Sequence, residues 1–176
     1  MIAVENISSR IDDKILFANL NNSFQTGRIH GIWHEKNEAG TAFLKLLAGD
    51  FLPDNGWFRY GRERLDHTDV AYYNRDDMPG AVFEMMPSSG LYKDKLIYLF
   101  DDVFDASDMR YFLFCYKIIL SLKEAGKTIL ITSTDHKVLT AFTDYFHILS
   151  GGVFQATLRF GQYDLLDEVL KHVRRF

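Results

Sequence analysis

Residues 96–132 contain the pattern that most restricts how this chain can fold. Leu96 to Phe100 form a continuous apolar run, and Asp101 and Asp102 follow it directly. A long amphipathic stretch runs from about Asp108 to Ala125, before a second apolar run from Thr128 to Thr132. Apolar strands without polar alternation are typical of parallel sheets that helices cover on both faces. The pattern therefore predicts a strand–helix–strand unit of an α/β fold.

The N-terminal part of the chain predicts a sheet of a different kind. Ile2 to Ile11 and Ile15 to Phe24 are rich in apolar and β-branched residues, and the pair Asp12-Asp13 lies between them, which indicates a hairpin. A strand over 28–33 and a helix from Glu38 to the C-cap candidate Gly49 follow. We expect the remaining elements as short strands at 57–60 and 70–73, short helices at 81–86 and 137–142, strands paired across Gly151-Gly152, and a last helix at 164–175.

Composition and charge exclude several classes of protein. A chain of 176 residues fits one globular domain, and its net charge of −4 offers no strongly basic face for nucleic acid. The single cysteine fits a reducing compartment. The first ten residues lack a secretion signal, and the longest apolar stretch, at 111–122, is shorter than the roughly 20 residues that span a bilayer. We expect a cytoplasmic protein without membrane insertion.

Several segments of the first sixty residues stand in a recognisable order. Residues 26–32 (TGRIHGI) precede residues 44–49 (LKLLAG), and residues 53–56 (PDNG) follow. In this order and spacing they resemble the nucleotide-binding domain of ATP-binding cassette (ABC) ATPases. The resemblance implies an α/β fold with a P-loop NTPase-like three-layer core and an N-terminal antiparallel β subdomain, within a single domain that spans residues 1–176.

The phosphate loop of that family, Gly-x-x-x-x-Gly-Lys-Ser/Thr, falls on residues 34–41 without gaps. His34 stands at the first glycine, Ala39 at the second and Gly40 at the lysine, whereas Thr41 keeps the hydroxyl that would hold Mg²⁺. The glycines let backbone N–H groups surround a phosphate, so their loss opposes binding. Lys36, four positions before the missing lysine, leaves the wrong side of the loop to replace it.

The strand that carries the family's second motif is better kept. Asp101 would hold Mg²⁺ through water, and Asp102 stands where the family has a general-base glutamate, one methylene longer. The alternative is that the two carboxylates face solvent or cap a turn. The family's switch histidine corresponds to Thr134, and the glutamine of its Q-loop falls near Arg75. The resemblance also suggests a D-loop at residues 105–108, where Ser107 or Asp108 equally serves as a helix cap.

A deletion is the largest departure from the family. Only about 20 residues, from 76 to 95, stand where the family inserts a helical subdomain with its Leu-Ser-Gly-Gly-Gln motif, so we expect that subdomain to be missing. Residues 149–152 (LSGG) lie too late in the chain and belong to a strand–turn–strand. The missing subdomain would expose an interface rich in aromatic residues and methionine, through which we expect the chain to self-associate or to dock a protein partner. Its expected members are Tyr72, Tyr73, Met78, Phe83, Met85 and Met86; alternatively, Phe83 and Met86 cover the sheet edge themselves.

Other candidate sites are weak. The six histidines show no helical zinc spacing, and Cys115 lies on the apolar side of a predicted helix, so we expect no metal site and a buried structural thiol. The aromatic residues between positions 111 and 116 cannot all share one helix face, and one or two are expected to reach a partner.

These observations lead to one hypothesis and two alternatives. We expect a catalytically inactive ABC-like protein that acts as a structural or regulatory protein-binding subunit, with no cofactor. The first alternative is a nucleotide-binding or weakly ATP-hydrolysing subunit that uses Mg-ATP through Thr41, Asp101 and Asp102. The second is an accessory of an ABC transporter that contacts a membrane complex.

Overall fold

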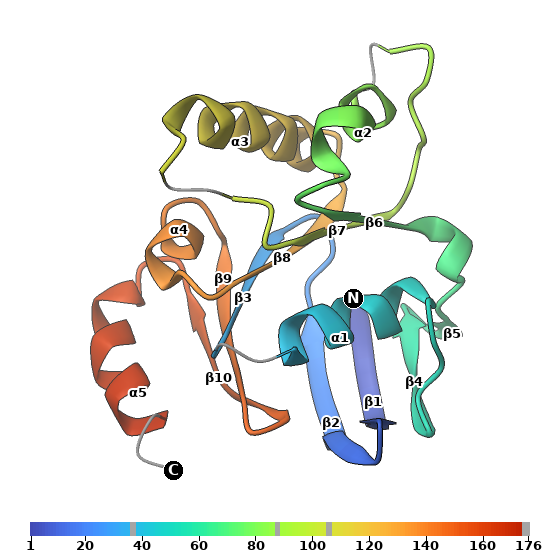
Figure 1. Ribbon diagram of the computed structural model, residues 1–176, viewed down its shortest axis with the longest axis vertical. Helices are drawn as coiled ribbons and strands as arrows, with labels where there is room; N and C mark the ends of the chain where they lie inside the picture. The colour runs from blue at the N-terminus through green and yellow to red at the C-terminus, as the bar shows by residue number, and fades with distance from the viewer. Residues whose placement is uncertain (36–37, 87–88, 105–106, 174–176) are drawn as a thin grey trace.

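The computed structural model describes residues 1–35, 38–86, 89–104 and 107–173 (Figure 1). The strands are β1 (Ile2–Ile11), β2 (Lys14–Phe24), β3 (Ile29–His34), β4 (Asn55–Tyr60), β5 (Glu63–Arg64), β6 (Val70–Asn74), β7 (Ile97–Asp101), β8 (Thr128–Ser133), β9 (Tyr145–Ser150) and β10 (Val153–Arg159). The helices are α1 (Ala39–Ala48), α2 (Met78–Met85), α3 (Met109–Glu124), α4 (His136–Thr140) and α5 (Leu166–Val173). Single 3-10 turns lie at His67–Asp69 and Tyr163–Leu165.

A mixed sheet in the order β10-β9-β3-β8-β7-β6 forms the centre of the molecule. The strands β6, β7, β8, β3 and β9 are parallel, and β10 is antiparallel to β9. The predicted strand–helix–strand unit is confirmed, because α3 connects the parallel neighbours β7 and β8. Both strands are buried along their whole length, which explains their continuous apolar sequences.

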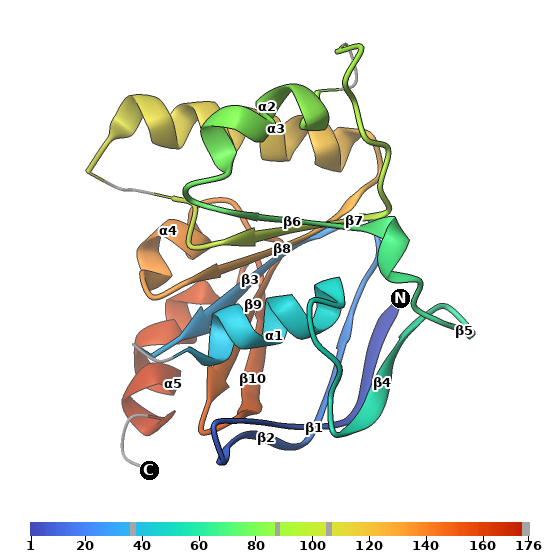
Figure 2. The ribbon, with the colours of Figure 1, turned by 45° about the vertical axis from the view of Figure 1, so that its right-hand side comes forward.

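The predicted antiparallel subdomain is also present. β1 and β2 form the hairpin, and the sheet order is β2-β1-β4-β5. Figures 1 and 2 show α1 between this sheet and the central sheet, with α2 and α3 on the opposite face of the central sheet. Phe43 of α1 contacts Phe17, Phe58 and Phe154, with ring centroids 6.5, 6.2 and 5.3 Å away. The aromatic rings of both sheets therefore hold α1, the helix that follows the phosphate-loop segment, in place.

The ends of several helices differ from the sequence predictions, most of all in α2 and α5. α2 begins at Met78, three residues before the predicted start, because Pro79 lies in its first turn, where its fixed φ favours a helix start. The last helix begins at Leu166, after a 3-10 turn, and the predicted residues beyond Val173 lie outside the described part of the chain. The predicted C-cap of α1 is confirmed, since Gly49 has φ 85° and its N–H reaches the carbonyl groups of Leu46 and Lys45.

The expected aromatic and methionine interface is only partly exposed. Tyr73, Met78 and Met85 are buried in the core beneath α2, so the prediction that they face a partner is wrong. They are buried because α2 folds back over the edge of the central sheet and turns these side chains inward. Phe83 and Met86 remain exposed, at 59% and 37%.

The segment between β6 and β7 holds α2 and its connecting coil in its described residues. The absence of a helical subdomain here stays a prediction. Within the described ranges, each helix is too short or too polar to span a bilayer.

Candidate functional site

The candidate site lies where the parallel strands of the central sheet end. His34 is the last residue of β3, Asp101 ends β7, and Thr132 lies one residue before the end of β8. The carboxyl ends of neighbouring parallel strands meet at one edge, where open α/β sheets bind their ligands. The fold therefore brings together residues of the phosphate loop and of the second motif, which are about sixty positions apart in the sequence.

The imidazole of His34 packs against the first turn of α1. His34 is only 6% exposed, and its Nδ1–H donates to the Glu35 carbonyl at 2.8 Å. A Cβ added to Gly40 would lie 2.5 Å from Nε2 and 2.9 Å from Cγ of this ring, and closer still to Cδ2. Gly40 therefore makes room for the ring. The His34 Nε2 atom is buried without a hydrogen-bond partner among the described residues.

Among the described residues, Thr41 makes no hydrogen bond to the carboxylate at the end of β7. It lines a cavity of about 550 Å³ together with Ile11, Glu38, Ala42, Lys45, Asp50 and Phe51. A second cavity, of about 570 Å³, lies near the start of α1, where Lys14, Glu38, Ala39 and Gly152 contribute to its wall. Lys36, which the spacing puts on the wrong side of the loop to replace the family's lysine, lies outside the described residues.

Both carboxylate oxygens of Asp101 are held by hydroxyl groups. The Thr132 hydroxyl donates to Oδ1 at 2.6 Å, and the Tyr72 hydroxyl donates to Oδ2 at 2.8 Å. Asp101 itself is 6% exposed. Burial, and then the hydrogen bond to Asp101, raises the pKa of Tyr72 well above its usual value, so this hydroxyl keeps its proton. Hydroxyl groups from the neighbouring strands β6 and β8 thus provide both hydrogen bonds to the carboxylate that the sequence predicted to bind a metal.

Solved structures of ABC transporters have this arrangement of strands and helices. The chain superposes with a TM-score of 0.80 on an ATP-binding cassette of an ABC transporter in its ADP conformation, at 12% identity over 99% of this chain and 97% of that one. The chain has the ATP-binding cassette fold.

Two other solved structures match the fold of this chain. The structure of cbiO1 from Clostridium perfringens, part of the ABC transporter complex cbiONQ, matches with a TM-score of 0.75 and 12% identity, over 98% of this chain and 93% of that one. A bacterial Atm1-family ABC exporter with ATP bound matches with a TM-score of 0.75 and 14% identity, over 96% of this chain and 40% of the exporter chain.

Sequence comparison gives one shorter match. An uncharacterized ABC transporter ATP-binding protein of Bacillus subtilis, YkpA, is 38% identical over 56 residues, which are 32% of this chain. The match spans about a tenth of that protein's length. No protein-family model matches the chain.

Arg75 joins the cassette site in a way that the sequence did not predict. Its Nε–H donates to the carbonyl of Asp102 and its Nη2–H to the carbonyl of Phe104, both at 3.2 Å. The guanidinium also lies 3.9 Å from the Asp102 carboxylate. The sequence does hold a signal for this contact, because a cation follows β6 and two adjacent aspartates lie at the end of the neighbouring strand β7. Asp102 has φ 48°, in the left-handed region that aspartate adopts more readily than most residues, and Arg75 donates a hydrogen bond to its carbonyl in this conformation.

Other residues singled out in the sequence have structural roles. Asp108 caps α3, accepting from the N–H groups of Arg110 and Tyr111, whereas residues 105 and 106 of the suggested D-loop lie outside the described residues. The LSGG segment forms the turn between β9 and β10, as expected. Cys115 is fully buried, and burial raises the pKa of its thiol, which fits a structural role.

A buried histidine pair lies near the other end of β3, on the same face as His34, and was not predicted. His30 Nε2–H donates to the Gln25 carbonyl at 2.8 Å, so its Nδ1 accepts from His147 Nε2–H at 3.0 Å. His147 Nδ1 then accepts from the Thr157 hydroxyl at 2.9 Å. Burial lowers the pKa of His30 to about 4 and that of His147 well below its usual range. Both rings are neutral at pH 7, and the described residues include no cluster of three or more side chains suited to a metal.

Proposed function

We propose that this chain is a catalytically inactive ATP-binding-cassette-fold protein that serves as a structural or regulatory protein-binding subunit. The observation that carries the proposal is the contact between His34 and Gly40. The imidazole fills the space that a side chain at position 40 would need, and position 40 is where the resemblance puts the phosphate-binding lysine. A lysine at this position would contribute a charge-assisted hydrogen bond of roughly 1.5–3 kcal/mol to a bound phosphate.

The two aspartates support the same proposal. Asp101 already accepts hydrogen bonds from Tyr72 and Thr132, so a metal-bound water would have to share its oxygens with them. The Asp102 carboxylate lies 3.9 Å from the Arg75 guanidinium, so an attacking water would have to share this carboxylate with a cation. A general base must also reach the attacking water, and Asp102 is one methylene shorter than the family's glutamate.

Calorimetry with Mg-ATP tests the proposal. We expect no heat of binding to the wild-type chain at millimolar ATP. The matched variant carries His34→Gly, Ala39→Gly and Gly40→Lys together, which removes the ring and restores the motif; we expect it to gain measurable affinity without appreciable turnover. A dissociation constant in the low micromolar range for the wild-type chain would overturn the proposal.

A nucleotide-binding or weakly ATP-hydrolysing subunit of an ABC-type complex is the second candidate. It is favoured by the resemblance to ATP-binding proteins of ABC transporters and by the retained Thr41 and Asp101. If nucleotide binds, Thr41→Ala and Asp101→Asn should each abolish binding, because both residues would act through Mg²⁺. Binding that neither substitution changes would place the nucleotide in another pocket and contradict this candidate.

The proposal includes a partner and a location. ABC ATPase domains pair with other subunits, so we propose a protein partner, with contact to a membrane complex, in the cytoplasm. The net charge of −4 favours a protein over a nucleic acid as that partner.

A further inference from the structure

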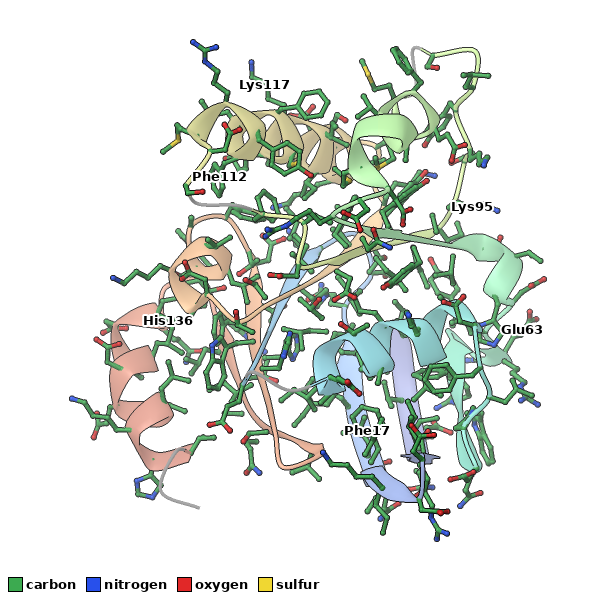
Figure 3. All side chains as sticks on the ribbon, in the orientation of Figure 1. Phe17, Glu63, Lys95, Phe112, Lys117 and His136 are labelled. Atoms are coloured by element: carbon green, nitrogen blue, oxygen red, sulfur yellow. The ribbon has the colours of Figure 1, made fainter. Side chains whose placement is uncertain are left out.

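The solvent side of α3 combines exposed apolar side chains with cations. Leu113 is 47% and Phe114 41% exposed, whereas Cys115 and Ile119 of the same helix are fully buried. At 3.6 residues per turn, Leu113, Lys117, Arg110 and Phe114 fall within an arc of about 100°. We call these four residues the α3 outer face. Figure 3 shows Lys117 on the side of α3 that points away from the central sheet, and Phe112 on the side toward α4.

The cations of this face have no acidic partner in the part of the chain that the structure describes. Neither Arg110 nor Lys117 has a side-chain hydrogen bond or ion pair among the described residues. The nearby acids are occupied or distant. Asp108 caps the helix, Glu84 of α2 pairs with Lys93, and Glu124 lies two turns beyond Lys117. Two cations thus lie about 10 Å apart along the helix axis, with apolar side chains between them.

We propose that the α3 outer face docks an amphipathic helix of a protein partner that carries carboxylates beside its apolar stripe. The inference rests on the proposed protein-binding function and names the surface and the partner's chemistry. Leu113 and Phe114 supply apolar area that a partner's stripe buries. Arg110 and Lys117 select acidic over basic partners, because they attract a carboxylate of the partner and repel a cation in the same place.

A second copy of the chain fits this face poorly. Two α3 helices paired about a twofold axis between Leu113 and Phe114 would run antiparallel, and Arg110 of one copy would then face Lys117 of the other. Both contacts would join like charges. An anionic membrane also fits poorly, because two cations contribute only about 2 kcal/mol of attraction and the chain as a whole carries a net charge of −4.

A pair of designed peptides tests the proposal on the intact chain. The first is an amphipathic helical peptide with a leucine face bordered by glutamates, and the second has lysine in place of each glutamate. We expect the wild-type chain to bind the glutamate peptide, more weakly at high salt, with hydrogen-exchange protection confined to α3. The double variant Arg110→Glu/Lys117→Glu should weaken this binding about tenfold and favour the lysine peptide instead. The matched control Lys137→Glu, which removes an exposed cation of α4, should change neither affinity.

A third variant tests whether the apolar side chains of the α3 outer face contribute to peptide binding. Leu113→Gln with Phe114→Gln should weaken the binding of the glutamate peptide to the wild-type chain. The same two changes should weaken the binding of the lysine peptide to the charge-reversal variant, since both peptides use the same apolar contact. The proposal is overturned if the charge-reversal variant binds the glutamate peptide as tightly as the wild type does. Self-association through α3, or binding to phosphatidylserine vesicles in place of the peptide, would also overturn it. Calorimetry with ATP does not probe this face, so the proposed function and this surface can fail separately.

Discussion

The contact between His34 and Gly40 makes an unusual prediction for the substitution Gly40→Ala. In an exposed helix, glycine to alanine stabilises a protein by up to about 1 kcal/mol. Here the new Cβ would lie under 3 Å from three atoms of a buried imidazole, and overpacking of this kind costs about 1–3 kcal/mol. We therefore expect Gly40→Ala to lower the free energy of unfolding by about 1 kcal/mol.

A double-mutant cycle isolates the cause. In the background His34→Ala the ring is gone, so Gly40→Ala should stabilise by up to about 1 kcal/mol. The coupling between the two positions is then about 2 kcal/mol, which urea unfolding resolves. Gly80→Ala in α2 is the matched control, because a Cβ there meets no atom within 4 Å and should stabilise the chain in either background. If Gly40→Ala stabilises the protein that retains His34, the ring does not occupy this space and the reasoning is refuted.

Further predictions concern the buried polar groups and the cysteine. Asp101→Asn replaces an acceptor of two hydroxyl hydrogen bonds with a group that also donates, and should cost about 1–3 kcal/mol of unfolding free energy, against about 1 kcal/mol for Tyr72→Phe; equal effects would contradict the network. His30 has a pKa of about 4 in the folded chain and about 6.5 in the unfolded chain. Its neutral ring should therefore contribute fully to the free energy of unfolding above pH 6.5, and about 3 kcal/mol of this contribution should be lost as the pH drops to 4. Chemical denaturation across this range should show the loss, and a pH-independent midpoint would exclude it. Cys115 should react with a thiol reagent far more slowly in the native than in the unfolded chain, since burial raises its pKa; rapid labelling of native protein would show an exposed thiol.

The course of the backbone was largely readable from local patterns. The hairpin of β1 and β2, the unit β7–α3–β8 and the end of α1 at Gly49 were all predicted, because each depends on residues close together in the chain. Hydrophobic periodicity and turn residues act over a few positions, so one sequence suffices to find them. The order of short segments also indicated the cassette fold.

The sequence further determined which residues stand where the resemblance puts the family's phosphate loop, since the positions of His34, Ala39 and Gly40 follow directly from the spacing. It did not determine which side chain occupies the space beside Gly40. Only the tertiary structure decided that the ring of His34 turns onto Gly40, because this depends on the angle between β3 and α1.

Contacts between distant residues explain the remaining differences. Tyr72 reaches Asp101 across 29 positions, Arg75 reaches Asp102 across 27, and His30 reaches His147 across 117. The members of each pair lie on neighbouring strands or directly after them, and strand order is set by the packing of the whole sheet rather than by any local pattern. The sequence by itself determined most of the helices and strands and the residues at the expected phosphate-loop positions. The tertiary structure alone decided which side chains meet, because their partners come from segments that are distant in the chain and adjacent only after folding.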